Sequence, residues 1–213
     1  MIECQDVSFS YPASTLPDSE RQAGGALKHI SCTIEDGSFV LLCGTSGCGK
    51  TTMTRLFNGL FPHYHEGTYT GSVYLGGKDT RDLSLFDISL KVGSVFQNPR
   101  SQFFNVDTTS ELAFGPENHG IAEDLVRDRV KRVAAQLKLE PLLDRSIFSL
   151  SGGEKQKIAC GSAAAIDPDV YVLDEPSPNL DAYAIADFRQ LLFTLKSQGK
   201  PIIISEHRLY YLS

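Results

Sequence analysis

The stretch GTSGCGKTT, residues 44–52, decides the fold, and it directly follows the apolar run FVLLC at residues 39–43. It matches the pattern G-x-x-x-x-G-K-[ST], in which glycines let backbone N–H groups approach phosphate oxygens closely. The order of strand, loop and a helix that stops near Gly59 predicts an α/β P-loop fold. The expected phosphate-binding residues are Gly44, Thr45, Ser46, Gly47, Cys48, Gly49, Lys50, Thr51 and Thr52.

Two side chains of this loop have separate chemical roles. Lys50 supplies a positive charge for the terminal phosphates of a nucleotide, and Thr51 supplies a hydroxyl oxygen to Mg²⁺. A purely structural turn is a poor alternative, because the pattern lies between a predicted strand and a predicted helix.

A second stretch, VYVLDEPSPNLD at residues 170–181, places two carboxylates after four apolar residues. Ligands of open α/β sheets gather at the carboxyl ends of the strands. Asp174 is therefore expected to hold Mg²⁺ through water, and Glu175 to orient the attacking water or accept its proton. After a strand, such a pair alone would more often be a turn, but beside a P-loop it indicates a site.

Two single polar residues follow other apolar runs. Gln97 comes after GSVF and could contact Mg²⁺ or water, and His207 comes after PIIIS and could contact the terminal phosphate and the water. On the residues alone, an ordinary surface position is an equally good interpretation of each.

A third stretch, LSGGEKQKIACG at residues 150–161, combines a helix start with two glycines. Ser151 and Glu154 have the spacing of a capping box. Gly152 and Gly153 weaken the first turn of a helix, so they indicate a need for bare backbone amides near an anion. An ordinary helix cap explains Ser151 and Glu154 but not the glycines.

The remaining patterns complete the predicted architecture. Apolar runs at 91–96, 170–173 and 201–205 predict further strands of a mainly parallel sheet. In residues 2–11 and 31–38, apolar and polar residues alternate, which predicts an antiparallel sheet beside it. Residues 98–168 contain no convincing strand and predict a helical insert in a single domain, 1–213. Two amphipathic helix faces are expected, one formed by Val126, Val130, Val133 and Leu137 and the other by Ile185, Phe188, Leu192 and Leu195, with Asp181 as a cap.

Composition excludes several classes of protein. The 213 residues are 41% hydrophobic, which suits one compact core, and the net charge of -6 argues against broad contact with nucleic acid. Five cysteines without a CxxC pair indicate neither a disulfide framework nor a zinc site. No run approaches the roughly 18 apolar residues of a membrane span, and no signal peptide is recognisable.

In this order, the motifs resemble those of the nucleotide-binding domain of ABC ATPases. The resemblance covers nearly the whole chain: Tyr11 before the first turn, GTSGCGKTT, VFQNP with Gln97, LSGGEKQKIA, VLDEPSPNLD and SEHRL with His207. It implies ATP and Mg²⁺ as cofactors, with Tyr11 on the adenine, Gln97 among the metal contacts, Glu175 as base and His207 as its catalytic partner.

The resemblance also implies a role for the two glycines of the third stretch. In such ATPases, two domains pack head to tail, so Ser151, Gly152 and Gly153 would bind the γ-phosphate held by the P-loop of a second domain. That domain could be identical or paralogous, and Asp181 would face it. The segment SPNLD, residues 177–181, corresponds to the D-loop of this family. It has Pro178 where many relatives have a small residue, so the role of Asn179 is open.

Finer features resemble the ATPases of energy-coupling-factor importers, which take up vitamins or metal ions. These features are FNGLFPHYHEGTYTGSVYLGGKD, VFQNPRSQFF and SEHRLYYL. The resemblance implies a peripheral location on the cytoplasmic face of the membrane. It also implies a transmembrane partner whose coupling helices dock near residues 100–118, with Phe103 and Phe104. For HYH, at His63 to His65, a loop histidine pair is favoured over a metal site.

Two other classes of function remain as alternatives. One is a soluble ABC ATPase of DNA repair or ribosome handling, disfavoured by the acidic balance and the absence of long heptad repeats. The other is an ATP-binding module without turnover, disfavoured by the joint presence of Lys50, Asp174, Glu175 and His207. The chain ends six residues after His207, where a carboxyl-terminal extension is expected, so a truncated or tandem arrangement is predicted.

Overall fold

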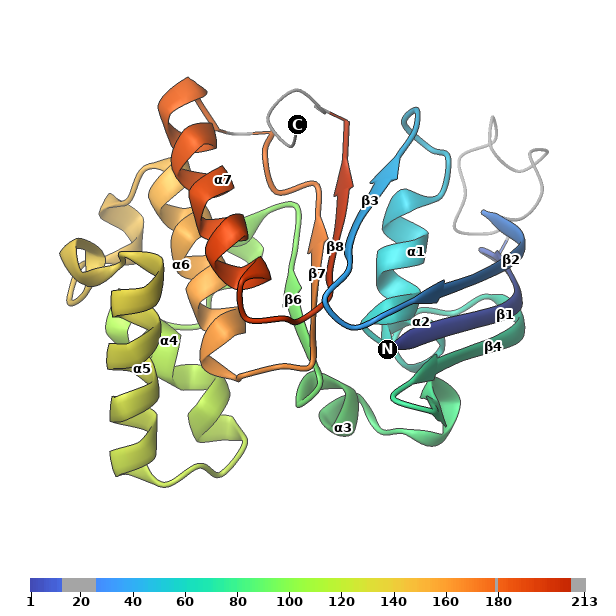
Figure 1. Ribbon diagram of the computed structural model, residues 1–213, viewed down its shortest axis with the longest axis horizontal. Helices are drawn as coiled ribbons and strands as arrows, with labels where there is room; N and C mark the ends of the chain where they lie inside the picture. The colour runs from blue at the N-terminus through green and yellow to red at the C-terminus, as the bar shows by residue number, and fades with distance from the viewer. Residues whose placement is uncertain (13–25, 179, 208–213) are drawn as a thin grey trace.

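The computed structural model describes residues 1–12, 26–178 and 180–207. Its strands form two four-stranded sheets, one parallel and one antiparallel (Figure 1). This confirms the predicted α/β fold with a parallel sheet and an antiparallel flank. The polar stretch at residues 13–25, which contains STLPDSERQAGG and is predicted to form a turn-rich loop, lies outside the described residues.

The parallel sheet has the strand order β3-β8-β7-β6. Its strands are β3 (Phe39–Cys43), β6 (Val92–Val95), β7 (Val170–Asp174) and β8 (Ile202–Glu206). Every residue of β7 and β8 is buried, as their apolar runs predict. Strand β3, at one edge of this sheet, is half-buried over residues 39–42 and exposed at Cys43, which is less burial than its apolar run FVLLC predicts.

The antiparallel sheet has the order β2-β1-β4-β5. It consists of β1 (Ile2–Ser10), β2 (Leu27–Ile34), β4 (Thr68–Leu75) and β5 (Lys78–Asp79). Strand β1 is the centre of the sheet, paired with β2 on one side and β4 on the other. Strands β4 and β5 were not among the predicted elements.

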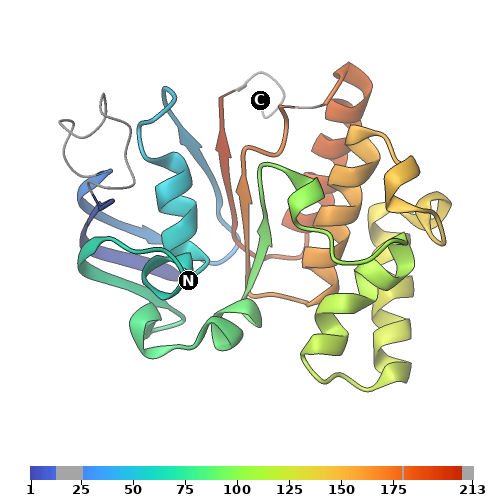
Figure 2. The same cartoon turned by 180° about the vertical axis from the view of Figure 1, so that it is seen from behind.

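Alternate residues of β7 point into two different cores. Tyr171 and Leu173 pack with helices α4 to α7, whereas Val170 and Val172 pack with α1 and the antiparallel sheet. Figures 1 and 2 accordingly show α1 on one side of the parallel sheet and α6 and α7 on the other. The helices are α1 (Lys50–Phe57), α2 (Leu60–His63), α3 (Leu85–Ser89), α4 (Thr108–Asn118), α5 (Glu123–Leu137), α6 (Gly152–Ala165) and α7 (Ala182–Lys196).

Residues 98–168 form α4, α5 and α6 together with short 3-10 turns, and their one β-contact is an isolated bridge between Asp107 and Ser146. Among the described residues, the 3-10 turns are η2 (Thr80–Asp82), η3 (Pro99–Ser101), η4 (Glu140–Leu142) and η5 (Ile147–Ser149). The two predicted apolar helix faces are confirmed, because all eight of their residues are buried on α5 and α7. Within the described ranges, no helix is both long and apolar enough to cross a membrane.

Candidate active site

The P-loop lies between the carboxyl end of β3 and the start of α1, and its residues 44–48 are exposed to solvent. Gly49 has a φ of 99°, in the left-handed region, and a Cβ added there would come within 2.5 Å of the carbonyl oxygen of Ala26. Any other residue would therefore clash with the backbone. Glycine is needed here so that the chain can turn sharply into the helix.

The start of α1 suits an anion. Gly49 is its N-cap residue and provides no side-chain cap, and no acidic residue lies in the first turn. The first N–H groups of a helix have no partner within the helix, and the helix dipole adds partial positive charge there. Phosphate oxygens are the natural acceptors for such amides next to an exposed glycine loop.

Lys50 lies beside this loop with its side chain only 5% exposed. Its Nζ donates hydrogen bonds to the carbonyl oxygens of Gly44 (3.1 Å) and Thr45 (3.0 Å). The same atom is 3.8 Å from Oε1 of Glu175. The positive charge is thus held between the P-loop and the carboxylates at the end of β7.

Asp174, the last residue of β7, receives hydrogen bonds from two hydroxyl groups. Thr51 Oγ1 donates to Asp174 Oδ1 at 3.2 Å, and Ser205 Oγ donates to the same oxygen at 2.6 Å. Mg²⁺ in phosphate-transfer sites is bound by one or two carboxylates and substrate oxygens rather than by a full protein cage. Thr51 and Asp174 provide oxygen donors of this kind, and the described residues contain no cluster of three metal-binding side chains.

Glu175 is held from several directions. Its Oε2 accepts a hydrogen bond from Gln97 Nε2 at 3.0 Å, and its Oε1 lies 2.8 Å from His207 Nε2. Its backbone has a φ of 42°, which is uncommon for a residue with a side chain and typical of functional sites. The structure therefore brings Gln97, Glu175 and His207, from three strand ends, into one cluster with Lys50.

Ser205 and Glu206 are part of this cluster, although the sequence did not single them out. Ser205 is 0% exposed, donates to Asp174, and accepts a hydrogen bond from the Glu175 backbone N–H at 3.0 Å. Glu206 is 1% exposed and bonds to the backbone of Ser177 and His207. The available signal was their place at the end of the buried run PIIIS, directly before His207.

Tyr11 lies next to α1. Its hydroxyl group is 3.1 Å from Thr52 Oγ1 and accepts a hydrogen bond from Arg55 Nη1 at 3.3 Å. Its ring packs edge-on against Phe9 and Phe61. The residue is therefore near the helix that follows the P-loop, and its contact with adenine stays a prediction.

The predicted capping box at the start of α6 is present. Ser151 Oγ accepts from the Glu154 N–H at 3.2 Å, and Glu154 Oε2 accepts from the Ser151 N–H at 2.8 Å. These bonds lower the pKa of Glu154, and an ion pair with Arg145 adds to the effect. Ser151 and Gly152 are exposed, whereas Gly153 is half-buried.

Gly153 also has a packing reason to be glycine. An anion was expected to be the reason for both glycines, but a Cβ at Gly153 would come within 2.6 Å of the Cβ of Ala184. The close approach of α6 and α7 therefore requires a glycine at position 153, and the expected contact of its N–H with a phosphate stays a prediction.

The structure does not bring residues 151–153 to the P-loop of the same chain. Helix α1 packs on one face of the parallel sheet and α6 packs on the other (Figure 1). Both helices begin toward the carboxyl edge of the sheet, where β7 and β8 end. One chain thus presents two separate helix starts with exposed glycines.

Two further predicted features have mixed outcomes. Phe104 is 75% exposed and stacks on Phe114, whereas Phe103 is half-buried against the core, so only part of the expected aromatic surface is exposed. His63 is the last residue of α2, not a loop residue, and its Nε2 lies 2.8 Å from the carbonyl oxygen of Thr80. His65 packs against Phe61.

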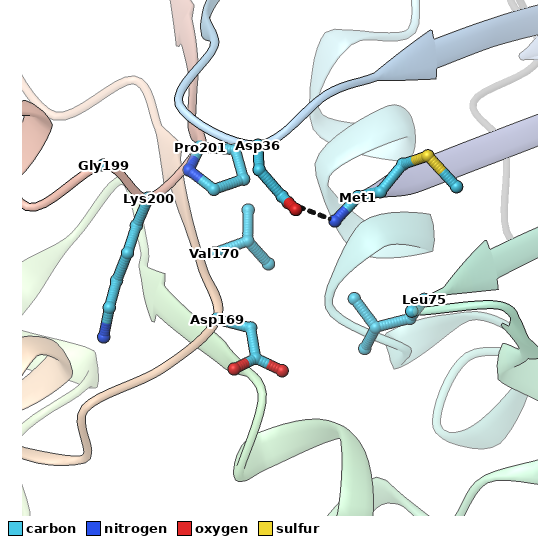
Figure 3. A pocket seen from close by; sticks show the side chains of 9 residues that line it. Met1, Asp36, Leu75, Asp169, Val170, Gly199, Lys200 and Pro201 are labelled. Atoms are coloured by element: carbon cyan, nitrogen blue, oxygen red, sulfur yellow. Dashed lines mark hydrogen bonds and ion pairs between the residues drawn. The ribbon is translucent and has the colours of Figure 1, made fainter.

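A pocket of about 350 Å³ lies at the opposite edge of the parallel sheet, where β7 begins (Figure 3). Its lining includes Asp36, Asp169 and Lys200. The amino group of Met1 pairs with Asp36 at 2.5 Å, and Lys200 pairs with Asp167 rather than with the pocket carboxylates. The pocket is separate from the cluster at the carboxyl ends of the strands.

The fold and the P-loop with its two carboxylates define an α/β P-loop nucleotide-binding protein. Comparison with known proteins narrows this class. The family model described as ABC transporter matches residues 27–178. A Treponema denticola protein that carries the name of an ABC transporter ATP-binding protein is 48% identical over 212 residues, covering 100% of this chain and 42% of that protein.

Solved structures agree with this result. The cbiO1 protein from Clostridium perfringens, part of the ABC transporter complex cbiONQ, has a TM-score of 0.81 and 27% identity, over 98% of this chain and 78% of that one. The dimeric structure of MJ0796, a bacterial ABC transporter cassette, has a TM-score of 0.79 and 25% identity, over 99% of this chain and 90% of that one. The chain belongs to the ABC transporter family. It spans 42% of the length of the first two curated relatives that it matches.

Proposed function

We propose that the chain hydrolyses ATP to drive a membrane importer of the energy-coupling-factor type, with a vitamin or a metal ion as the transported solute. Residues 1–213 would form one ATPase domain, with a helical subdomain at about 98–168. The observation that carries the proposal is the cluster around Glu175, which joins Gln97, His207 and Lys50 beside the P-loop. The similarity to cbiO1 and the sequence motifs after the P-loop support the importer type.

In the proposed reaction, the ATP phosphates bind the glycine loop, residues 44–49, and the start of α1, and Tyr11 stacks on the adenine. Thr51 and Asp174 would hold Mg²⁺, with Gln97 close by, and the bound ion neutralises charge on the phosphate oxygens. Lys50 places its positive charge on the terminal phosphates.

Glu175 carries the chemical step. The oxygen of a water molecule forms a bond to the γ-phosphorus, the bond from that phosphorus to the bridging oxygen breaks, and ADP leaves. The proton of the water passes to the Glu175 carboxylate, which Gln97 and His207 hold in place through hydrogen bonds. Ser205 orients the Asp174 carboxylate and holds the Glu175 backbone, because its hydroxyl donates to Asp174 and accepts from the Glu175 N–H.

The complete site requires a second ABC ATPase domain, identical or paralogous. The position of residues 151–153 on the opposite face of the sheet from α1 supports this, because these residues cannot reach the P-loop of their own chain. In a head-to-tail pair, Ser151, Gly152 and Gly153 of each domain would bind the γ-phosphate held by the other. The dimeric state of the MJ0796 cassette agrees with such a pair.

The proposed location is the cytoplasmic face of the membrane, without nucleic acid as a partner. A transmembrane subunit would dock its coupling helices near residues 100–118. The exposed ring of Phe104 supports this docking surface.

Glu175→Gln tests the proposed function. The amide keeps the shape of the side chain but cannot accept the proton. We expect ATP binding to be retained, phosphate release to fall by about a hundredfold or more, and a dimer to accumulate with ATP in size-exclusion chromatography. Asp79→Asn is the control, because it also neutralises one carboxylate but lies in the antiparallel sheet. Turnover equal to that of the unmodified protein would refute the assignment.

A further inference from the structure

Glu206, the last residue of β8, connects two backbone segments of the site. Its side chain is buried, with 1% of the residue exposed. Its Oε1 accepts a hydrogen bond from the Ser177 N–H at 3.1 Å, and its Oε2 accepts one from the His207 N–H at 2.9 Å. One carboxylate oxygen thus receives an N–H from a segment 29 positions away, and the other receives the N–H of the next residue, His207.

The two segments have different roles in the proposed function. His207 contacts Glu175 through its ring. Ser177 belongs to the connection between β7 and α7, which leads to Asp181, the residue expected to face the second ATPase domain. Glu206 therefore lies between the catalytic cluster and the connection that leads to the partner.

A buried carboxylate is stable only while its oxygens are paired. Hydrogen bonds from backbone N–H groups to a charged oxygen are about twice as strong as neutral ones. If the Ser177 segment moves, the carboxylate either follows it, which changes its bond to the His207 backbone, or loses the Ser177 N–H as a buried partner. The position of one segment is thereby linked to that of the other.

We propose that Glu206 is a positioning residue that makes the placement of His207 against Glu175 depend on the conformation of the connection beginning at Ser177. Docking of the second domain on this connection then adjusts the rate of hydrolysis. The inference rests on the proposed ATPase function and adds a means by which the partner controls it.

Another buried glutamate shows how this arrangement differs from ordinary loop anchoring. Glu111 accepts from the N–H groups of Phe104 and Asn105, two neighbours in one loop, through the single oxygen Oε2. Glu206 instead uses both oxygens and joins Ser177 to His207, which lie on connections that follow two different strands. Holding a single loop would not need both oxygens.

Glu206→Gln in the full-length protein tests the proposal. Glutamine has nearly the same shape, but it has only one acceptor oxygen, so one of the two N–H groups loses its partner. We expect kcat for ATP hydrolysis to fall by about ten- to a hundredfold, while the ATP Kd and KM change by less than about twofold. Asp79→Asn is the matched control with one charge removed outside the site. A joint loss of affinity, rate and unfolding temperature in Glu206→Gln would show a merely structural residue and overturn the proposal.

Hydrogen exchange on the unmodified protein gives a second test that does not depend on the variant folding. The amides of Ser177 and His207 should both be protected, and their protection should change together when a non-hydrolysable ATP analogue is added. Rapid exchange at either amide, or a change confined to one, would overturn the proposal. If the unmodified protein shows no ATP turnover, the proposed function fails, whereas the exchange data still decide whether the connection through Glu206 exists.

Discussion

His207 Nε2 lies 2.8 Å from Oε1 of Glu175, the same oxygen that is 3.8 Å from Lys50 Nζ. The histidine is half-exposed, while the carboxylate side chain is only 14% exposed. The two residues follow different strands, and the pairing of β7 with β8 brings them together.

Replacing His207 tests the value of this contact. In His207→Ala, the Glu175 carboxylate keeps Gln97 and Lys50 but loses the ring that orients Oε1. We expect kcat for ATP hydrolysis to fall by about a hundredfold with ATP binding retained, measured by phosphate release and a fluorescent ATP analogue. His29→Ala is the matched control, since His29 also pairs with a carboxylate at 2.8 Å, that of Asp6, on the antiparallel sheet. Equal rates in the two variants would contradict the assignment.

Gly153 should be sensitive to packing. The Cβ in Gly153→Ala would meet the Cβ of Ala184, and we expect a loss of about 1–3 kcal/mol in the free energy of unfolding, measured with urea. Ala184→Gly removes the opposing methyl group, so the double variant should recover part of that loss relative to the sum of the single changes. Additive effects would mean that α6 and α7 do not approach as closely as the structure places them.

The capping box at α6 should contribute stability that depends on pH. The hydrogen bonds from Ser151 lower the pKa of Glu154 in the folded state below its usual value of 4.5. A lowered folded pKa means that the contribution is fully present above the unfolded value and is lost as pH falls through the folded value. We expect Glu154→Gln to cost about 1 kcal/mol near pH 7 and much less in acid, measured by urea unfolding at several pH values. A cost that does not change with pH would contradict this.

Alkylation of Cys48 should block ATP binding. Cys48 is exposed in the P-loop, where an added group would occupy the space needed by the phosphates. We expect N-ethylmaleimide to abolish binding and MgATP to protect, with Cys48→Ser insensitive to the reagent. Cys32 needs a control of its own, because a hydrogen bond with Cys4 lowers the pKa of Cys32 to about 7. The comparison is therefore made in a Cys32→Ser background, where continued inactivation of Cys48→Ser would identify a different thiol.

The apolar runs of the sequence were sufficient to predict the parallel sheet, and the P-loop together with the carboxylates after one run predicted Lys50, Asp174 and Glu175 as site residues. The site roles of Gln97 and His207 were expected only from the family resemblance. Asp174, Glu175, Gln97 and His207 all lie where a strand ends. The positions of their side chains relative to one another depend on which strands pair, and a single sequence does not reveal that pairing.

The features that were missed depend on contacts between distant residues. Ser205 and Glu206 are polar residues whose burial comes from neighbouring segments, and their one local signal is their place at the end of an apolar run, directly before His207. The close approach of Gly153 to Ala184 joins two helices across 31 positions of the chain. Strand β4, with the sequence TYTGSVYL, contains Gly71, which breaks the local pattern of a strand.

Strand β7 has a wider consequence, because its successive residues belong to two cores. Neither core can unfold while the other stays folded, because each would lose the β7 side chains that pack in it. The carboxylates at the end of the strand would be lost in that same event. On heating, ATPase activity and folded structure should therefore be lost over the same temperature range.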